Sequence, residues 1–166
     1  MNNFSSQHAH EQLDHEMVMI EVNLDDCSSE VLAYTMDQLL AAGANDVYYT
    51  SIYMKKNRPA YKLSVLTSPT KQQKLEKIIF RETTSFGLRF FPVSCHRLGR
   101  EFCKAKTQWG EVSVKIGIYQ GERIKFSPEF EECRALAEKH NLPLQLIYDE
   151  AKSIAISQKN KKIPPF

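Results

Sequence analysis

The fold is decided by residues 17–40, which read MVMIEVNLDDCSSEVLAYTMDQLL. Apolar and polar residues alternate at the start of this stretch, so residues 17–24 are predicted to form a half-buried strand. Ser28 is a suitable helix N-cap, and apolar residues recur after it at helical spacing until Gly43 ends the helix. A strand followed by an amphipathic helix is the first half of a split βαβ unit.

The chain up to residue 93 completes this pattern with a hairpin, a second helix and a fourth strand. Predicted strands over 46–55 and 61–66 flank the break Lys56-Asn57-Arg58-Pro59. Ser68-Pro69 suits a helix start, and the fourth strand is expected over 87–93. We therefore expect an α+β fold, a ferredoxin-like split βαβ antiparallel sheet with both helices on one face.

The other face of this sheet is expected to stay open. Because side chains alternate along a strand, the first strand turns Glu21, Asn23 and Asp25 away from the helices. A ligand or a partner subunit could reach these polar groups on the open face.

A C-terminal strand–helix extension is expected to follow the sheet. Strands are predicted over 102–106 and 111–119, Ser127-Pro128 opens a third helix, and a final helix covers 144–156. The four cysteines form no CxxC pair, so free thiols are expected. Cys133 lies on the apolar stripe of the third helix and is expected to be buried.

Composition and charge narrow the class of protein. The 166 residues are 42% hydrophobic and 25% charged, which fits one globular domain. We expect that domain over 17–157, between a disordered tail over 1–16 and a polar tail over 158–166.

The net charge of +2 is too small to argue for nucleic-acid binding. No apolar run approaches the ~20 residues of a membrane span and no signal-peptide core is visible, so a cytoplasmic protein without a membrane partner is expected.

Two groups of polar residues suit a metal–phosphate ligand. The adjacent carboxylates of Asp25 and Asp26 could hold Mg²⁺ or Mn²⁺ through oxygen ligands, or Asp26 or Ser28 could simply cap the helix that follows. The cations in 54–59 could clamp a polyphosphate, or could keep a charged loop soluble. The residues alone leave these alternatives open.

Two further groups give weaker signals. The segment 82–89 joins hydroxyl groups, a glycine and a basic residue, which could bind phosphate or ribose, but the same residues also suit a helix-to-strand turn. The acidic residues over 129–132 most simply interact with the dipole of the third helix at its first turn, and metal binding is the alternative.

Taken together, four blocks resemble a known family. NLDDCSSE, MKKNRPAYKLSVL, FRETTSFGLR and KFSPEFEEC occur in this order, and the chain over 18–155 is similar to the C-terminal domain of the LarC family of nickel insertion proteins. The resemblance implies a CTP-dependent nickel insertase, a cyclometallase of the lyase class. Its substrate would be pyridinium bisthiocarboxylic acid mononucleotide, which Ni²⁺ converts to the nickel-pincer cofactor of lactate racemase. The resemblance also implies an N-terminal half that acts with this domain and can be a separate chain.

The resemblance assigns residues to a site for CTP with Mg²⁺ or Mn²⁺. Divalent-metal binding would fall to Asp25 and Asp26. The nucleotide would be bound by matched residues of the second and third blocks: Lys55, Lys56, Arg58, Glu82, Thr83, Thr84 and Arg89. No catalytic residue can be named. Three positions depart from the family pattern: Cys27 stands for Met, Asn57 for Gly, and Ser85 for a third Thr.

A homo-oligomer, a trimer or a hexamer, is also expected. The alternative to an insertase is a non-catalytic ferredoxin-like oligomerisation or nucleotide-sensing module, because an exposed sheet face suits subunit packing. RNA binding through the sheet is disfavoured, since the basic-Gly-aromatic order of an RNP1 motif is absent near the fourth strand.

Overall fold

The computed structural model describes residues 10–158, which divide into two compact units. The four-stranded unit comprises Leu13–Cys95, and the three-stranded unit comprises residues 10–12 and 96–158. The sequence predicted one domain with an appended extension, whereas the C-terminal part has a sheet and a core of its own. Of the two predicted tails, residues 1–9 and 159–166 lie outside the described residues.

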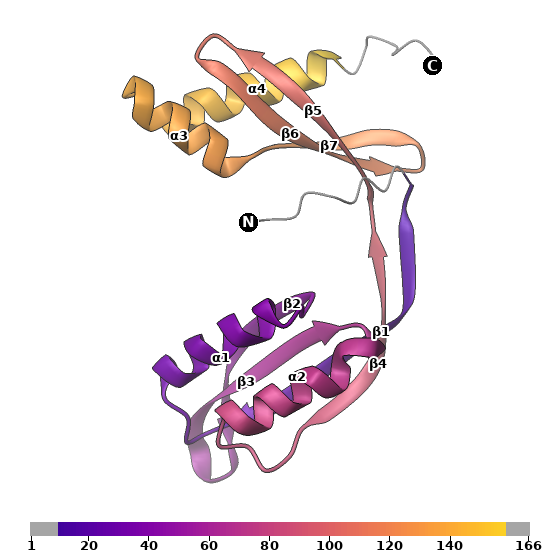
Figure 1. The fold of residues 1–166 in the computed structure, drawn as a ribbon, viewed down its shortest axis with the longest axis vertical. Coiled ribbons are helices and arrows are strands. Elements are labelled where there is room, and N and C mark those ends of the chain that lie inside the picture. The colour runs from indigo at the N-terminus through magenta and orange to yellow at the C-terminus, as the bar shows by residue number, and fades with distance from the viewer. Residues whose placement is uncertain (1–9, 159–166) are drawn as a thin grey trace. The chain divides into compact units, whose positions relative to one another are not determined.

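The four-stranded unit has the element order β-α-β-β-α-β. Its elements are β1 (Gln12–Leu24), α1 (Ser29–Ala41), β2 (Asp46–Met54), the single turn η1 (Lys55–Asn57), β3 (Arg58–Thr67), α2 (Pro69–Glu82) and β4 (Arg89–Arg97). The strands lie in the order β2-β3-β1-β4, with α1 and α2 side by side on one face (Figure 1). The predicted α+β class is confirmed, and β1 pairs with β3 and β3 with β2 in antiparallel fashion.

The alternation in β1 positions both faces of this sheet. Glu21 lies opposite Ser64 and Asn23 opposite Lys62 in the β1–β3 pairing. The intervening residues enter a core that α1 and α2 complete. Its most deeply buried members are each at most 1% exposed: Ile20, Val22, Leu39, Leu63, Val65, Leu75 and Ile79. The polar residues of β1 therefore occupy the face that the unit's own helices do not cover.

Both helix boundaries of α1 follow from local chemistry. Ser28 caps the helix, since its Oγ accepts a hydrogen bond from the Val31 backbone N–H at 3.3 Å. Gly43, at φ 97°, adopts the left-handed backbone that ends the helix region, as the sequence predicted. Strand β1 starts earlier than expected, at Gln12, so residues 12–16 of the predicted tail belong to this strand.

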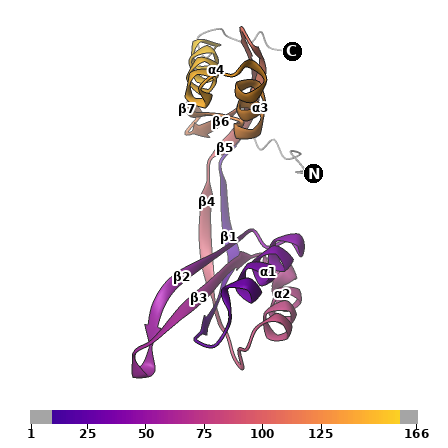
Figure 2. The same ribbon diagram turned by 90° about the vertical axis from the view of Figure 1, so that its left-hand side faces the viewer.

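The three-stranded unit consists of a meander covered by two helices. Its elements are β5 (Gly99–Thr107), β6 (Gly110–Tyr119), β7 (Glu122–Pro128), α3 (Phe130–His140) and α4 (Leu144–Gln158). The strands lie in the order β5-β6-β7, and the helices pack on one side of them (Figure 2). The core contains Cys133, Ile147 and Ala151, each 0% exposed, which confirms the predicted burial of Cys133.

Strand β7 corrects the prediction for this region. The third helix was expected to open at Ser127-Pro128, but these residues end β7 and the helix begins at Phe130. Pro128 pairs with Val114 at the edge of the sheet, where the missing proline N–H costs no ladder hydrogen bond. Among residues 10–158, no helix is long and apolar enough to cross a membrane.

Candidate functional site

Three of the four sequence blocks meet at the C-terminal end of β1. Arg58, which begins β3, donates a hydrogen bond from Nη1 to Asp25 Oδ2 at 2.9 Å. Thr84, in the loop after α2, donates its hydroxyl to Asp26 Oδ1. Residues 33 and 58 positions apart in the sequence thus converge on two adjacent carboxylates. The fold brings the paired aspartates, one cation of the hairpin block and one threonine together.

A second set of ion pairs lies on the open sheet face, centred on Glu21. Lys62 Nζ donates to Glu21 Oε1 at 2.7 Å, and Arg89 donates from Nε and Nη2 to Oε2 at 3.0 and 2.8 Å. Arg89 Nη2 also donates to Asn23 Oδ1 at 3.1 Å. The Glu21 side chain is only 13% exposed. Arg89 is therefore fixed on the open face by two neighbours on β1.

The electrostatics of these carboxylates follow from their partners. The pKa of Glu21 is lowered chiefly by the hydrogen bond from Lys62, with Arg89 adding to the effect. The pKa of Asp25 is lowered mainly by the hydrogen bond from Arg58, and the charges of Arg58 and Lys55 act in the same direction. Both carboxylates are thus held anionic well below neutral pH.

The turn η1 exposes two further cations. Lys56 and Asn57 have left-handed backbones, with φ of 63° and 57°. Asparagine adopts this conformation more readily than most residues, so Asn57 suits a position where glycine was expected. The side chains of Lys55 and Lys56 are exposed, and neither ammonium has an ion-pair or hydrogen-bond partner among residues 10–158. These are cations left available to an anionic ligand.

The loop between α2 and β4 uses most of its polar groups to hold its own shape. Thr83 Oγ1 donates to Ile79 O at 2.7 Å, and Ser85 N donates to Thr83 Oγ1 at 3.3 Å. Ser85 Oγ in turn accepts from Gly87 N at 3.2 Å. Glu82 pairs with Arg81 at 2.6 Å. Of the predicted residues in this loop, Thr84 is therefore the one that contacts the aspartates.

The donor set fits a divalent metal that arrives with a phosphate ligand. Mg²⁺ is commonly held by one or two carboxylates together with substrate phosphate oxygens and water. Asp25 and Asp26 supply two hard oxygen donors, and the charges of Arg58 and Lys55 act on Asp25. Among residues 10–158, no group of three or more His, Cys, Asp or Glu side chains is arranged to hold a metal by itself. Phosphate oxygens would complete the coordination.

The fourth block is placed elsewhere. Glu132, near the start of α3, accepts hydrogen bonds from the backbone N–H and, at 2.8 Å, the hydroxyl of Ser113 on β6. Glu129 N donates to Ser113 O at 2.8 Å. These contacts join α3 to the sheet of the three-stranded unit. This acidic segment therefore has a clear structural role within its own unit.

Sequence reasoning missed Lys62 as a member of the site, and it identified Glu21 only as an open-face residue. The sequence offers only a weak signal for Lys62. It lies two residues before Ser64, so the two side chains share one face of the strand, which is the open face of the sheet. The strand register would have been needed to place it beside Glu21.

Comparison with known proteins points to one family. The model of the nickel insertion protein family matches residues 3–148. The chain is 48% identical over 132 residues to a putative nickel insertion protein of Wolinella succinogenes, covering 79% of this chain and 33% of that protein. It is 42% identical over 139 residues to the pyridinium-3,5-bisthiocarboxylic acid mononucleotide nickel insertion protein of Acetivibrio thermocellus, covering 84% of this chain and 34% of that protein. The chain spans about a third of the length of the curated relatives it matches.

Solved structures agree with this assignment. The fold matches LarC2, the C-terminal domain of a cyclometallase involved in the synthesis of the NPN cofactor of lactate racemase, in its apo form, with a TM-score of 0.81 and 39% identity. That match covers 88% of this chain and 99% of LarC2. A protein of Methanopyrus kandleri shares the fold, with a TM-score of 0.68 and 22% identity over 90% of this chain and 92% of that one. The chain belongs to the nickel insertion protein family, and it corresponds to the C-terminal domain of that family.

Proposed function

We propose that this chain binds CTP together with Mg²⁺ or Mn²⁺ and acts as the nucleotide-binding domain of a nickel insertase. The observation that carries the proposal is the convergence of Asp25, Asp26, Arg58 and Thr84 at the end of β1. Adjacent carboxylates beside unpaired lysines are the pairing that a metal–triphosphate ligand requires.

Each cation has a distinct part in this proposal. Lys55 and Lys56, which are exposed on η1, would contact the triphosphate as point charges. Arg58 would offer its guanidinium to a phosphate oxygen while it stays close to Asp25. β1 lies between β3 and β4 in the sheet. Arg89, on β4, therefore lies on the other side of β1 from the residues of β3.

The carboxylates would hold the divalent metal. Asp25 and Asp26 supply two oxygen ligands, and phosphate oxygens supply others. The bound metal would neutralise charge that develops on the triphosphate. Thr84 orients Asp26 through its hydroxyl. Glu82 and Thr83 would act at the edge of the proposed nucleotide site, since both also have partners on α2.

The complete reaction would need more than this chain. The match covers about a third of each relative's length, so we propose that an N-terminal half acts with this domain on pyridinium bisthiocarboxylic acid mononucleotide. Ni²⁺ is the inserted metal and therefore a substrate. Assembly into a homo-oligomer, a trimer or a hexamer, is part of the same proposal.

Isothermal titration calorimetry of the full chain with CTP and MnCl₂ tests the nucleotide part. We expect CTP to bind in the presence of Mn²⁺ and more tightly than ATP. Lys55→Gln should weaken binding, whereas Lys77→Gln, which removes a lysine charge from α2, should not. Equal binding of CTP and ATP, or equal effects of the two variants, would contradict the proposal.

A maturation assay separates the insertase from the non-catalytic alternative. With a relative's N-terminal half supplied as a separate chain, we expect Asp25→Ala and Lys55→Ala to abolish most nickel-cofactor formation. If both variants supported normal formation, the chain would instead be an oligomerisation or nucleotide-sensing module.

A further inference from the structure

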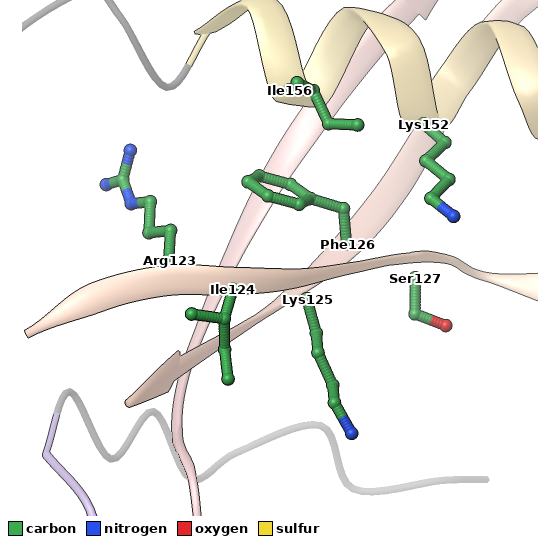
Figure 3. Close-up of a pocket in the computed structure, with 7 residues that line it drawn as sticks. All are labelled: Arg123, Ile124, Lys125, Phe126, Ser127, Lys152 and Ile156. Atoms are coloured by element: carbon green, nitrogen blue, oxygen red, sulfur yellow. The ribbon is translucent and has the colours of Figure 1, made fainter. Parts of the chain in front are cut away.

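A concave surface follows the outer edge of β7 in the three-stranded unit. We call it the β7 pocket; it has a volume of about 580 Å³ and is lined by Arg123, Ile124, Lys125, Phe126, Ser127, Lys152 and Ile156 (Figure 3). This volume lies within the range of small-molecule sites. None of the residues named in the proposed CTP site belongs to it, so it stands independently of that function.

A bulge in β7 determines which side chains of this strand lie on the same face of the sheet. Arg123 pairs with Ile118 and Lys125 pairs with Gly117, so Ile124 is an extra residue on the β7 side of the ladder. Phe126 pairs with Ile116. Because Ile116 and Ile118 are two residues apart, Arg123 and Phe126 share one face although they are three residues apart. Without the bulge, the guanidinium and the ring would lie on opposite faces.

The shared face is the one that α4 covers. Phe126 packs against the core cluster that contains Ala151 and Ala155 of α4. Figure 3 shows Arg123 and Phe126 projecting toward α4, from which Lys152 and Ile156 extend. Ile156 is 44% exposed, so an apolar surface beside the Phe126 ring remains open to a ligand.

The charges that line the pocket are all positive. Arg123 is anchored by Glu101, with Nε and Nη2 at 2.9 and 2.7 Å from Oε2. Lys125 and Lys152 are exposed, and within residues 10–158 neither ammonium has an ion-pair or hydrogen-bond partner. No carboxylate from the described part of the chain, residues 10–158, lines the pocket. Lys125 pairs with Gly117 and projects away from α4, whereas Lys152 extends from α4 on the same side as Phe126 and Ile156 (Figure 3). The uncompensated ammonium of Lys152 beside exposed apolar atoms favours an anion with an apolar part.

The edge position of β7 gives the pocket additional hydrogen-bond donors. β7 is the last strand of the order β5-β6-β7, so part of its backbone N–H and C=O groups faces away from β6. A phosphate or carboxylate at this edge could accept from such N–H groups as well as from Lys152. An apolar ring would lie against Phe126 and Ile156.

We propose that the β7 pocket binds a small organic anion that combines a flat ring with a phosphate or carboxylate group. The bulge at Ile124 assembles the site by placing Arg123 and Phe126 on one face. The ring of the ligand provides affinity through apolar contact, and the ammonium of Lys152 selects for negative charge.

Three probes separate these contributions on the full chain by two-dimensional ¹H–¹⁵N NMR titration. 1-Naphthyl phosphate carries both ring and charge, inorganic phosphate carries the charge alone, and 1-naphthol carries the ring alone. We expect 1-naphthyl phosphate to bind most tightly and to shift the amide signals of residues 123–127, 152 and 156. Inorganic phosphate that bound as tightly as 1-naphthyl phosphate, or shifts confined to other residues, would overturn the proposal.

Matched variants place the ligand. Lys152→Gln should weaken 1-naphthyl phosphate binding by up to about fivefold, the range for one exposed ion pair. Lys139→Gln, on an exposed lysine of α3, should leave it unchanged. Ile156→Ser should weaken binding, whereas Leu146→Ser, at a similarly exposed position of α4, should not. Equal effects within either pair would refute a site at β7.

Discussion

Replacement of Glu21 by glutamine tests the ion pairs on the open face of the four-stranded unit. The substitution keeps the shape of the side chain but removes the charge that accepts hydrogen bonds from Lys62 and Arg89 at 2.7 to 3.0 Å. Glu21 is 13% exposed, so water replaces these contacts poorly, whereas Arg89 is 51% exposed and is partly solvated after the change. We expect a loss of about 1–2 kcal/mol in the free energy of unfolding at pH 7.

The pH dependence of this loss has a definite sign. A carboxyl whose pKa is lowered in the folded state contributes stability above its unfolded pKa, about 4.3 for glutamate. That contribution is lost as the pH falls through the lowered pKa of folded Glu21. The stability difference between wild type and Glu21→Gln should therefore be full at pH 6–7 and should shrink as the pH falls below about 4.

The assay is urea unfolding followed by two-dimensional NMR, in which the amides of β1 and β3 report on their own unit. Glu16→Gln is the matched control, since Glu16 is an exposed carboxylate on the same strand. The reasoning is refuted if both variants lose the same stability. It is also refuted if the difference for Glu21→Gln stays constant down to pH 3.

Three further predictions concern single side chains. Arg58→Ala should raise the pKa of Asp25 toward its ordinary value, because Arg58 is the main cause of its lowering; NMR titration of the Asp25 carboxyl carbon measures this, and an unchanged pKa would contradict the assignment. Asn57→Gly should be tolerated, whereas Asn57→Val should cost about 1 kcal/mol or more at φ 57°, measured by urea unfolding. Ile147→Ala should destabilise the three-stranded unit by about 2–5 kcal/mol in the same assay, since Ile147 is 0% exposed; a loss below that range would show that the core relaxes into the space.

Alternation alone was enough to predict the open face of the first sheet. The period of two put Glu21, Asn23 and Asp25 on one side, and the contacts of Arg89 with the first two confirm it. The cation partner Lys62 was not predicted, because its place beside Glu21 depends on the β1–β3 register, which is a long-range property. The metal and nucleotide roles of the predicted residues remain predictions.

The C-terminal half was predicted less well, for a physical reason. Residues 122–128 read ERIKFSP, and the bulge at Ile124 breaks the alternation by which a strand is recognised. Ser127-Pro128 resembles a helix start, yet Pro128 closes an edge strand instead. Long-range pairing with β6 therefore determined that this region forms a strand, although its local sequence favours a helix start.

The loop from Thr83 to Gly87 has a consequence for binding thermodynamics. Its hydroxyl groups satisfy its own backbone, so the loop is already ordered when Thr84 meets Asp26. A ligand that binds there does not have to order a disordered loop, because the conformational entropy of those residues is already lost during folding. Binding at this corner should therefore show a small entropic penalty from the protein, and its affinity should reflect contacts with the ligand rather than rearrangement of the chain.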